Sequence, residues 1–245
     1  MSRRVISIGF LPDRNQRARD FTGAFLPSAR AWAGHALHSH QPPQHTHAAP
    51  LVQIDPTSSR VAMRAATLRA LEQLGRLGGA DDLRLAWFCH GFTRRIGLGW
   101  DVSTVRELAQ ACAGLIAADG VPIGGPTITI SLYACTTGTG PGPGGDGGFA
   151  DALRDALCVH ALRSCVVLGH ESAGHAARNP RKRRFAGDGS PIGGTGGSWW
   201  VAPGSQLWRP WRGSMTTGDL WIRCPYMTPA DVHREILGQL DGGPT

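Results

Sequence analysis

The sequence predicts an α/β protein with a mainly parallel sheet and helices on both faces of that sheet. Strand-like and helix-like segments alternate along the chain, as they do in βαβ units. Two of the strand-like segments are apolar almost throughout, which is typical of parallel strands that are covered on both faces. The 245 residues are enough for one such domain with a single core, so we treat residues 1–245 as one domain.

The N-terminal part predicts one strand followed by a long irregular stretch. Residues 5–10 (VISIGF) form the expected first strand, and residues 20–56 show no sustained periodicity apart from a short helix expected near residues 20–33. Residues 35–50 are rich in His and Pro. Five histidines cluster there, which suggests a metal site, but no acidic residues accompany the imidazoles, so a polar loop is the preferred interpretation.

The next segments predict a helix, a buried strand and a second helix. Thr57 or Ser58 can cap a helix that continues to Leu74. Its expected buried face consists of Val61, Ala65, Leu68 and Leu71. Residues 83–88 (LRLAWF) suit a buried parallel strand, and a helix with apolar residues on one face starts near Ser103.

The clearest strand is residues 127–134 (TITISLYA), which are rich in β-branched residues. A glycine-dense loop, residues 138–148, follows it and is interpreted as a flexible active-site rim and a candidate site of autoprocessing. The loop lacks the Lys-Ser/Thr of a phosphate-binding loop, so no cofactor is expected. A third helix over residues 149–157 and a strand over residues 165–168 complete the alternation.

Three consecutive predicted strands end in residues that can do chemistry. His90 follows the strand 83–88, Cys135 follows the strand 127–134, and His170 follows the strand 165–168. In parallel α/β sheets, ligands bind beyond the carboxyl ends of the strands. We therefore expect these side chains to meet at one edge of the sheet.

A cysteine beside a histidine is an arrangement for nucleophilic catalysis. A thiol attacks well only as a thiolate, and an imidazole can accept its proton. Cys135 and His90 can meet if their strands are neighbours, because adjacent strands lie about 5 Å apart. Gly91 allows a substrate carbonyl to approach a backbone N–H that could stabilise an oxyanion.

The blocks LRLAWFCHG (83–91) and ITISLYACTTG (128–138) resemble the caspase-like cysteine peptidases, which include caspases, metacaspases, legumains and clostripain-type enzymes. The His-to-Cys separation, 135 − 90 = 45 residues, is close to the roughly 50 residues of caspases. The resemblance covers about residues 80–170 and implies a three-layer sandwich and a cysteine endopeptidase, with His90 as acid–base, Cys135 as nucleophile and a protein or peptide as substrate. Caspases have a glycine two residues after the nucleophile, whereas here Gly138 is three residues after it, and the arginines that select aspartate cannot be mapped, so the preference at the cleavage site stays open.

Two other enzyme classes were considered. In an α/β-hydrolase, residues 90–92 would form the oxyanion loop and Ser172 the nucleophile, although His170 stands where the nucleophile elbow has a small residue. Metal hydrolysis is disfavoured because His170 and His175 are five residues apart and diverge on a helix. The further candidates for the substrate cleft are His170, Glu171, Ser172, Asp146 and Asp101.

The remaining alternative is a non-catalytic interaction module of the same fold. A basic run, RNPRKRR at residues 178–184, and the tryptophans of residues 199–221 could form its binding face. We interpret the basic run as a solvated loop, because the rest of the +7 charge is dispersed and no nucleic-acid-binding motif is present. Residues 186–245 are expected to be an irregular Gly- and Trp-rich extension.

The cysteines and the apolar runs bear on the protein's environment. None of the six cysteines forms a C-x-x-C pair, so neither a zinc site nor a disulfide framework is expected, and Cys112, Cys158 and Cys165 fall in predicted core segments. No apolar run approaches the roughly 20 residues that cross a bilayer. We therefore expect a reduced, cytoplasmic protein without a membrane partner.

Overall fold

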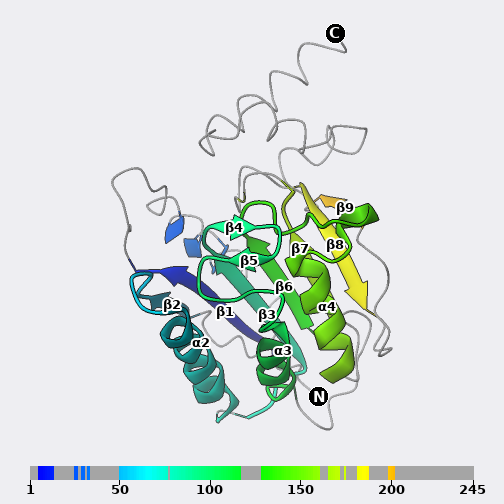
Figure 1. Cartoon of the computed structure of the whole chain (residues 1–245). Helices are drawn as coiled ribbons and strands as arrows, with labels where there is room; N and C mark the ends of the chain where they lie inside the picture. Colours follow the sequence, from blue (N-terminus) through cyan, green and yellow to red (C-terminus); the bar gives the residue numbers. More distant parts are fainter. Residues whose placement is uncertain are drawn as a thin grey trace.

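A computed structural model describes residues 5–13, 25–26, 29–30, 32–33, 50–76, 78–116, 128–160, 165–171, 174, 181–187 and 198–201 (Figure 1). Its elements are β1 (Val5–Pro12), β2 (Leu51–Ile54), α2 (Arg60–Gly75), β3 (Asp82–Phe88), β4 (Gly91–Phe92), β5 (Arg95–Ile96), α3 (Val105–Ala113), β6 (Ile128–Tyr133), η2 (Pro143–Gly145), α4 (Phe149–His160), β7 (Cys165–Gly169), β8 (Arg181–Gly187) and β9 (Ser198–Val201).

Seven strands form one sheet in the order β2-β1-β3-β6-β7-β8-β9. The first five strands of this order are parallel to one another, whereas β8 runs antiparallel to β7 and β9 antiparallel to β8. Strands β4 and β5 form a separate two-stranded hairpin. The predicted α/β class and mainly parallel sheet are therefore confirmed, and β3 and β6 are neighbours.

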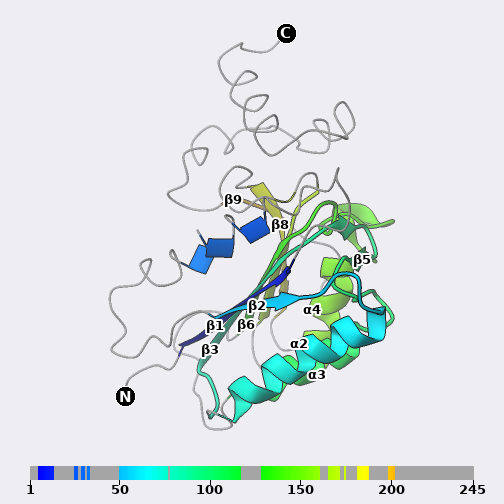
Figure 2. The same cartoon turned by 90° about the vertical axis from the view of Figure 1, so that its left-hand side faces the viewer.

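The three long helices of the described chain, α2, α3 and α4, lie on the same face of the sheet (Figure 2). A core forms between them and the sheet, in which Trp87 stacks on Phe10 with ring centroids 4.8 Å apart. On the other face the described residues are helical only in short pieces between residues 25 and 33, where Phe25 and Trp32 pack against the sheet. Among the described residues the predicted helices therefore cover one face of the sheet, and the other face carries only these short helical pieces.

Helix α2 differs in detail from its prediction. Ser59, not Thr57 or Ser58, caps it by accepting a hydrogen bond from the N–H of Ala62. The buried residues are Met63, Thr67 and Leu71, while Val61 is 65% exposed. The alanines and leucines of this helix are distributed around most of its circumference, so its sequence does not define a single apolar face. The buried face is therefore determined by packing against the sheet.

Three segments predicted to be irregular contain strands of the sheet. Strand β2 lies in the stretch 20–56, the basic run contributes β8, and β9 belongs to the C-terminal extension expected from residue 186 onward. In β8, Lys182 is buried with its ammonium 3.8 Å from the centroid of the Tyr133 ring, and Arg183 forms an ion pair with Glu171. Long basic side chains can bury their stems when their charged ends find partners, so residues 181–184 of the basic run can form a strand where a solvated loop was predicted. The histidine cluster and the rest of the extension lie outside the described residues.

Candidate functional site

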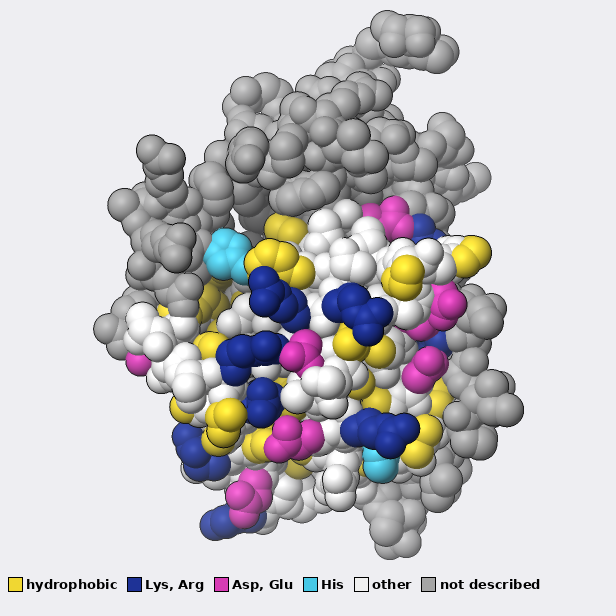
Figure 3. All heavy atoms as spheres, in the orientation of Figure 1, with side chains coloured by type: hydrophobic (Ala, Val, Ile, Leu, Met, Phe, Trp, Pro, Cys, Tyr) yellow, Lys and Arg dark blue, Asp and Glu magenta, His cyan; other side chains and the backbone are white. Residues whose placement is uncertain are grey.

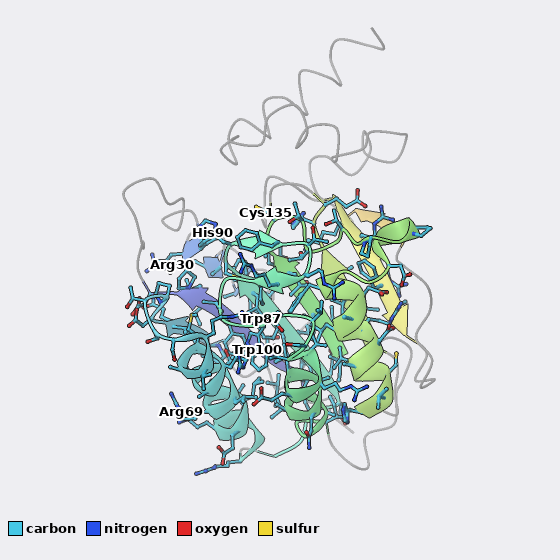
Figure 4. The ribbon with its side chains drawn as sticks, viewed as in Figure 1. Arg30, Arg69, Trp87, His90, Trp100 and Cys135 are labelled. Atoms are coloured by element: carbon cyan, nitrogen blue, oxygen red, sulfur yellow. The ribbon has the colours of Figure 1, made fainter. Side chains whose placement is uncertain are left out.

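The pairing of β3 with β6 brings His90 and Cys135 to the same level of the sheet. The last pair in this register is Phe88 with Tyr133, and His90 and Cys135 each follow two residues later. Neighbouring strands lie about 4.8 Å apart. Figure 4 shows both side chains at the upper edge of the sheet, where the carboxyl ends of the parallel strands lie.

Gly91 packs directly against the backbone of Cys135. A Cβ atom at position 91 would lie 2.2 Å from the carbonyl oxygen of Cys135 and 2.6 Å from its nitrogen. No side chain fits in this space, so the contact requires glycine. The loop that carries His90 and the loop that carries Cys135 are therefore in backbone contact immediately beside both residues.

Cys135 differs from the other described cysteines in its exposure. Its side chain is partly exposed, whereas Cys89, Cys112, Cys158 and Cys165 are buried. Burial of the sulfur nevertheless raises the pKa of Cys135 above its usual value, against the opposing effect of the Gly174 N–H, which donates to Sγ at 3.4 Å. The thiol is therefore protonated at neutral pH, and its proton must be removed as it reacts.

Thr136, directly after Cys135, has a left-handed backbone with φ of 55°. This conformation is unfavourable for a β-branched residue. Three hydrogen bonds hold the turn: the N–H and the hydroxyl of Thr139 donate to the Thr136 carbonyl at 3.1 and 2.6 Å, and the Thr137 hydroxyl donates to the Ala134 carbonyl at 2.9 Å. The strained turn at the end of β6 thus fixes the direction in which the chain leaves Cys135.

The glycine-dense loop, for which the sequence suggested a flexible active-site rim, is tightly packed. A Cβ at Gly148 would lie 1.9 Å from the carbonyl oxygen of Thr139, and one at Gly140 would lie 2.2 Å from the carbonyl oxygen of Asp146. The N–H of Gly138 donates to the carbonyl of His170 at 2.8 Å. Glycines in this loop permit close approach of backbone to backbone, so their abundance indicates compactness here.

His90 is held by the hairpin and by a residue from the other face of the sheet. Its carbonyl accepts a hydrogen bond from the Gly97 N–H at 2.7 Å. The ring of Phe25 meets the imidazole edge-on, with centroids 5.3 Å apart. These contacts hold the imidazole at the edge of the sheet, partly exposed.

Asp101, a candidate for substrate recognition, stabilises the loop that follows the hairpin. Its carboxylate accepts hydrogen bonds from the backbone N–H and the hydroxyl of Ser103 at 2.9 and 2.5 Å and forms an ion pair with Arg60. These hydrogen bonds, first of all the one from the Ser103 hydroxyl, lower the pKa of Asp101 to about 2. Asp101 and Thr136 both line a shallow depression, so Asp101 lies near the residue that follows Cys135. Its charge is already paired with Arg60.

The remaining predicted cleft residues have different surroundings. His170 is fully buried, with its ring centroid 6.0 Å from that of Tyr133, so its side chain does not line an open cleft. Glu171 is paired with Arg183, and Asp146 is partly exposed in the loop after Cys135, where its side chain packs against Gly142. Ser172 lies outside the described residues.

A buried ion pair beneath the loop after Cys135 was not anticipated. Asp151, in the first turn of α4, accepts a hydrogen bond from the Gly147 N–H at 2.9 Å and pairs with Arg154 at 2.5 Å. Burial raises the pKa of Asp151 to about 6 despite these partners. Spacing alone shows the i, i+3 pair on the helix, but only the structure shows that it lies under the loop.

Lys182 and Gly174 are two further residues near the candidate site that the sequence did not predict. Lys182 lies against the ring of Tyr133, which in turn stacks on Phe88 with centroids 4.7 Å apart. Gly174 packs so closely on the end of β6 that a Cβ there would lie 2.5 Å from the nitrogen of Ala134. The four consecutive basic residues of β8 (RKRR, 181–184) give no alternation that would mark Lys182 as buried, and nothing in the sequence identified Gly174.

No protein-family model matches the chain, and no curated protein or solved structure shows significant similarity to it. Among the described residues, no three His, Cys, Asp or Glu side chains group as metal ligands. No helix in the described part of the chain has the length and apolar character needed to cross a membrane.

Proposed function

We propose that this protein is a cysteine endopeptidase of the caspase-like type, with Cys135 as nucleophile and His90 as acid–base. The observation that supports this most directly is the register of β3 and β6, which carries both residues to the same position of one sheet edge. The close backbone contact of Gly91 with Cys135 adds a second, independent restraint on their separation.

The proposed reaction begins with the neutral thiol, because burial raises the pKa of Cys135. The sulfur attacks the carbonyl carbon of the scissile peptide bond while its proton passes to the imidazole of His90. Backbone N–H groups at the site, with that of Gly91 as the first candidate, stabilise the oxyanion. His90 then gives its proton to the leaving amine, and water, deprotonated by His90, hydrolyses the resulting thioester and regenerates the thiol.

The experiment that tests this is labelling of the full-length protein with peptidyl acyloxymethyl ketones that differ in the residue next to the reactive ketone. These probes alkylate a thiol that is activated at an acyl-transfer site, and peptide mass spectrometry identifies the modified cysteine. We expect Cys135 to be labelled, Cys135→Ala to abolish labelling, and His90→Ala to slow it at least 100-fold, in line with the usual contribution of general acid–base catalysis.

A matched control is His160→Ala, because His160 is an exposed histidine at the end of α4 and is remote in the chain from both loops. It should label at the wild-type rate. The proposal is wrong if Cys135 reacts no faster than other cysteines with every probe, or if His90→Ala and His160→Ala behave alike. Labelling of Ser172 by a fluorophosphonate would then favour the serine hydrolase, and failure of both probes would favour the interaction module.

A further inference from the structure

A cavity of about 270 Å³ opens beside His90. It lies between the hairpin β4–β5, the ends of β1 and β2, and the first turn of α2, on the side of the sheet that the three long helices cover. His90 is one of its lining residues, so whatever occupies it lies next to the proposed reacting groups.

The floor of this cavity is apolar. Met63, Ile96 and Leu98 line it and are 6%, 3% and 1% exposed. Among the described residues that line it there is no carboxylate. Burying a large aliphatic or aromatic side chain on such a surface is favourable, so the floor can bind an apolar substrate residue.

The rim of the cavity is basic. Arg60 and Arg95 line it, and both are exposed, so their charged ends lie at the opening. Arg60 is partnered by Asp101, whereas the guanidinium of Arg95 lies 4.4 Å above the centroid of the exposed Phe92 ring. In Figure 3, Lys and Arg side chains lie beside hydrophobic ones over the hairpin. A lysine or arginine side chain entering here meets like charge at the opening and finds no counter-ion inside.

We propose that this cavity binds a large apolar side chain of the peptide substrate beside the scissile bond, and that Arg95 disfavours basic residues there. The assignment rests on the proposed function, because His90 connects the cavity to the reacting groups. It defines a selectivity for neutral, bulky residues that the chemistry of the cysteine and histidine does not provide.

The test measures occupation of the cavity directly, without turnover. Full-length Cys135→Ala protein carries ¹³C-methyl methionine, and the Met63 signal is assigned by its loss in Met63→Leu. N-acetyl-phenylalanine amide, N-acetyl-lysine amide and N-acetyl-glutamate amide are titrated separately. We expect the phenylalanine amide to shift the Met63 methyl signal, while the lysine amide leaves it in place at the same concentrations.

Arg95→Glu and Arg94→Glu make a matched pair, because the two arginines are adjacent and exposed but only Arg95 lines this cavity. Arg95→Glu should tighten binding of the lysine amide roughly five- to tenfold, as expected for reversing one charge at an exposed site, and Arg94→Glu should change it less than twofold.

Three results would overturn the inference: no response of Met63 to the phenylalanine amide, a stronger response to the glutamate amide, or equal effects of the two arginine variants. If Met63 responds as expected but peptidyl ketones never label Cys135 in the wild-type protein, the preference of the cavity for a bulky apolar side chain stands, whereas the peptidase function fails and with it the role of the cavity as a substrate subsite. The two failures can therefore be distinguished.

Discussion

The two loops that follow the adjacent strands β3 and β6 are built in different ways. In the first, residues 89–104, side chains hold the chain: Asp101 binds Ser103, Thr104 and Arg60. In the second, residues 134–148, glycine backbone packs on backbone, as at Gly140 and Gly148. Apart from Gly91 and Gly99, which also pack on backbone, the His90 loop is therefore expected to tolerate change at single contacts, whereas the Cys135 loop depends on the absence of side chains at several positions.

The acidic residues of the two loops also differ in their environment. Asp101 has a lowered pKa because hydrogen bonds stabilise its charge, and Asp151 beneath the other loop has a raised pKa because burial penalises its charge. One carboxylate thus favours folding in its ionised form, and the other favours it in its protonated form.

The largest effect is expected from Gly148→Ala in the Cys135 loop. The new methyl group would lie 1.9 Å from the Thr139 carbonyl oxygen, a backbone atom that cannot move without displacing the turn after Cys135. We expect the free energy of unfolding to fall by about 3 kcal/mol, measured by urea denaturation. An effect below about 1 kcal/mol would show that this loop adapts and would remove the distinction between the two loops.

Gly91→Ala should uncouple the loops where they meet. The added Cβ must move away from the carbonyl oxygen of Cys135, at 2.2 Å, which separates His90 from the thiol. We expect probe labelling of Cys135 to slow at least tenfold and stability to fall by about 2 kcal/mol. Gly114→Ala is the control at the end of α3, where the nearest atom would lie 3.6 Å away, and it should retain the labelling rate.

The two carboxylates should respond to pH in opposite directions. Asp101 has a pKa of about 2, so the stability it contributes is present above pH 4 and is lost as pH falls toward 2. Asp151 has a pKa of about 6, so the stability it contributes is present below pH 4 and is lost as pH rises through 6. Asp101→Asn should therefore cost about 1 kcal/mol at pH 7 and less toward pH 2. Asp151→Asn removes a partner of the buried Arg154 and should lower stability, but its unfolding free energy relative to wild type should rise by about 1 kcal/mol between pH 4 and 7.

Unfolding free energies of the three proteins, measured in urea at pH 3, 4, 5.5 and 7, test this expectation. Stability curves that run parallel to the wild-type curve would contradict it, because they would mean that neither carboxyl changes its pKa on folding.

The smallest effect is expected outside both loops. Gly114 ends α3 with a helical φ of −65°, and a Cβ there would be 3.6 Å from its nearest neighbour. Gly114→Ala should raise the melting temperature slightly, corresponding to about 0.5 kcal/mol, because alanine restricts the unfolded chain. A loss as large as that of Gly148→Ala would show that glycine replacement is harmful everywhere in this chain, and not specifically in the Cys135 loop.

The sequence by itself determined four of the five parallel strands, with β2 missed, and the position of His90 and Cys135 directly after two of them. Strands β1, β3, β6 and β7 consist mostly of apolar residues, and α3 and α4 have clear apolar faces, so local pattern is sufficient to find them. The order along the chain then places the strand ends at one edge. The peptidase function and the cytoplasmic location stay predictions.

Only the tertiary structure decided what depends on contacts between distant segments. From sequence alone, the basic residues of β8 predict a loop. In the fold, Tyr133 contacts Lys182 and Glu171 pairs with Arg183, and these contacts allow the segment to form a strand. The glycines of residues 138–148 predict an irregular loop. The loop is compact because its glycines pack against the backbone of Thr139 and donate a hydrogen bond to the carbonyl of His170. Burial of the Cys135 sulfur, which keeps its thiol protonated, likewise arises from groups that lie far apart in the chain. Desolvation depends on all atoms around the sulfur in space and not only on residues adjacent in sequence.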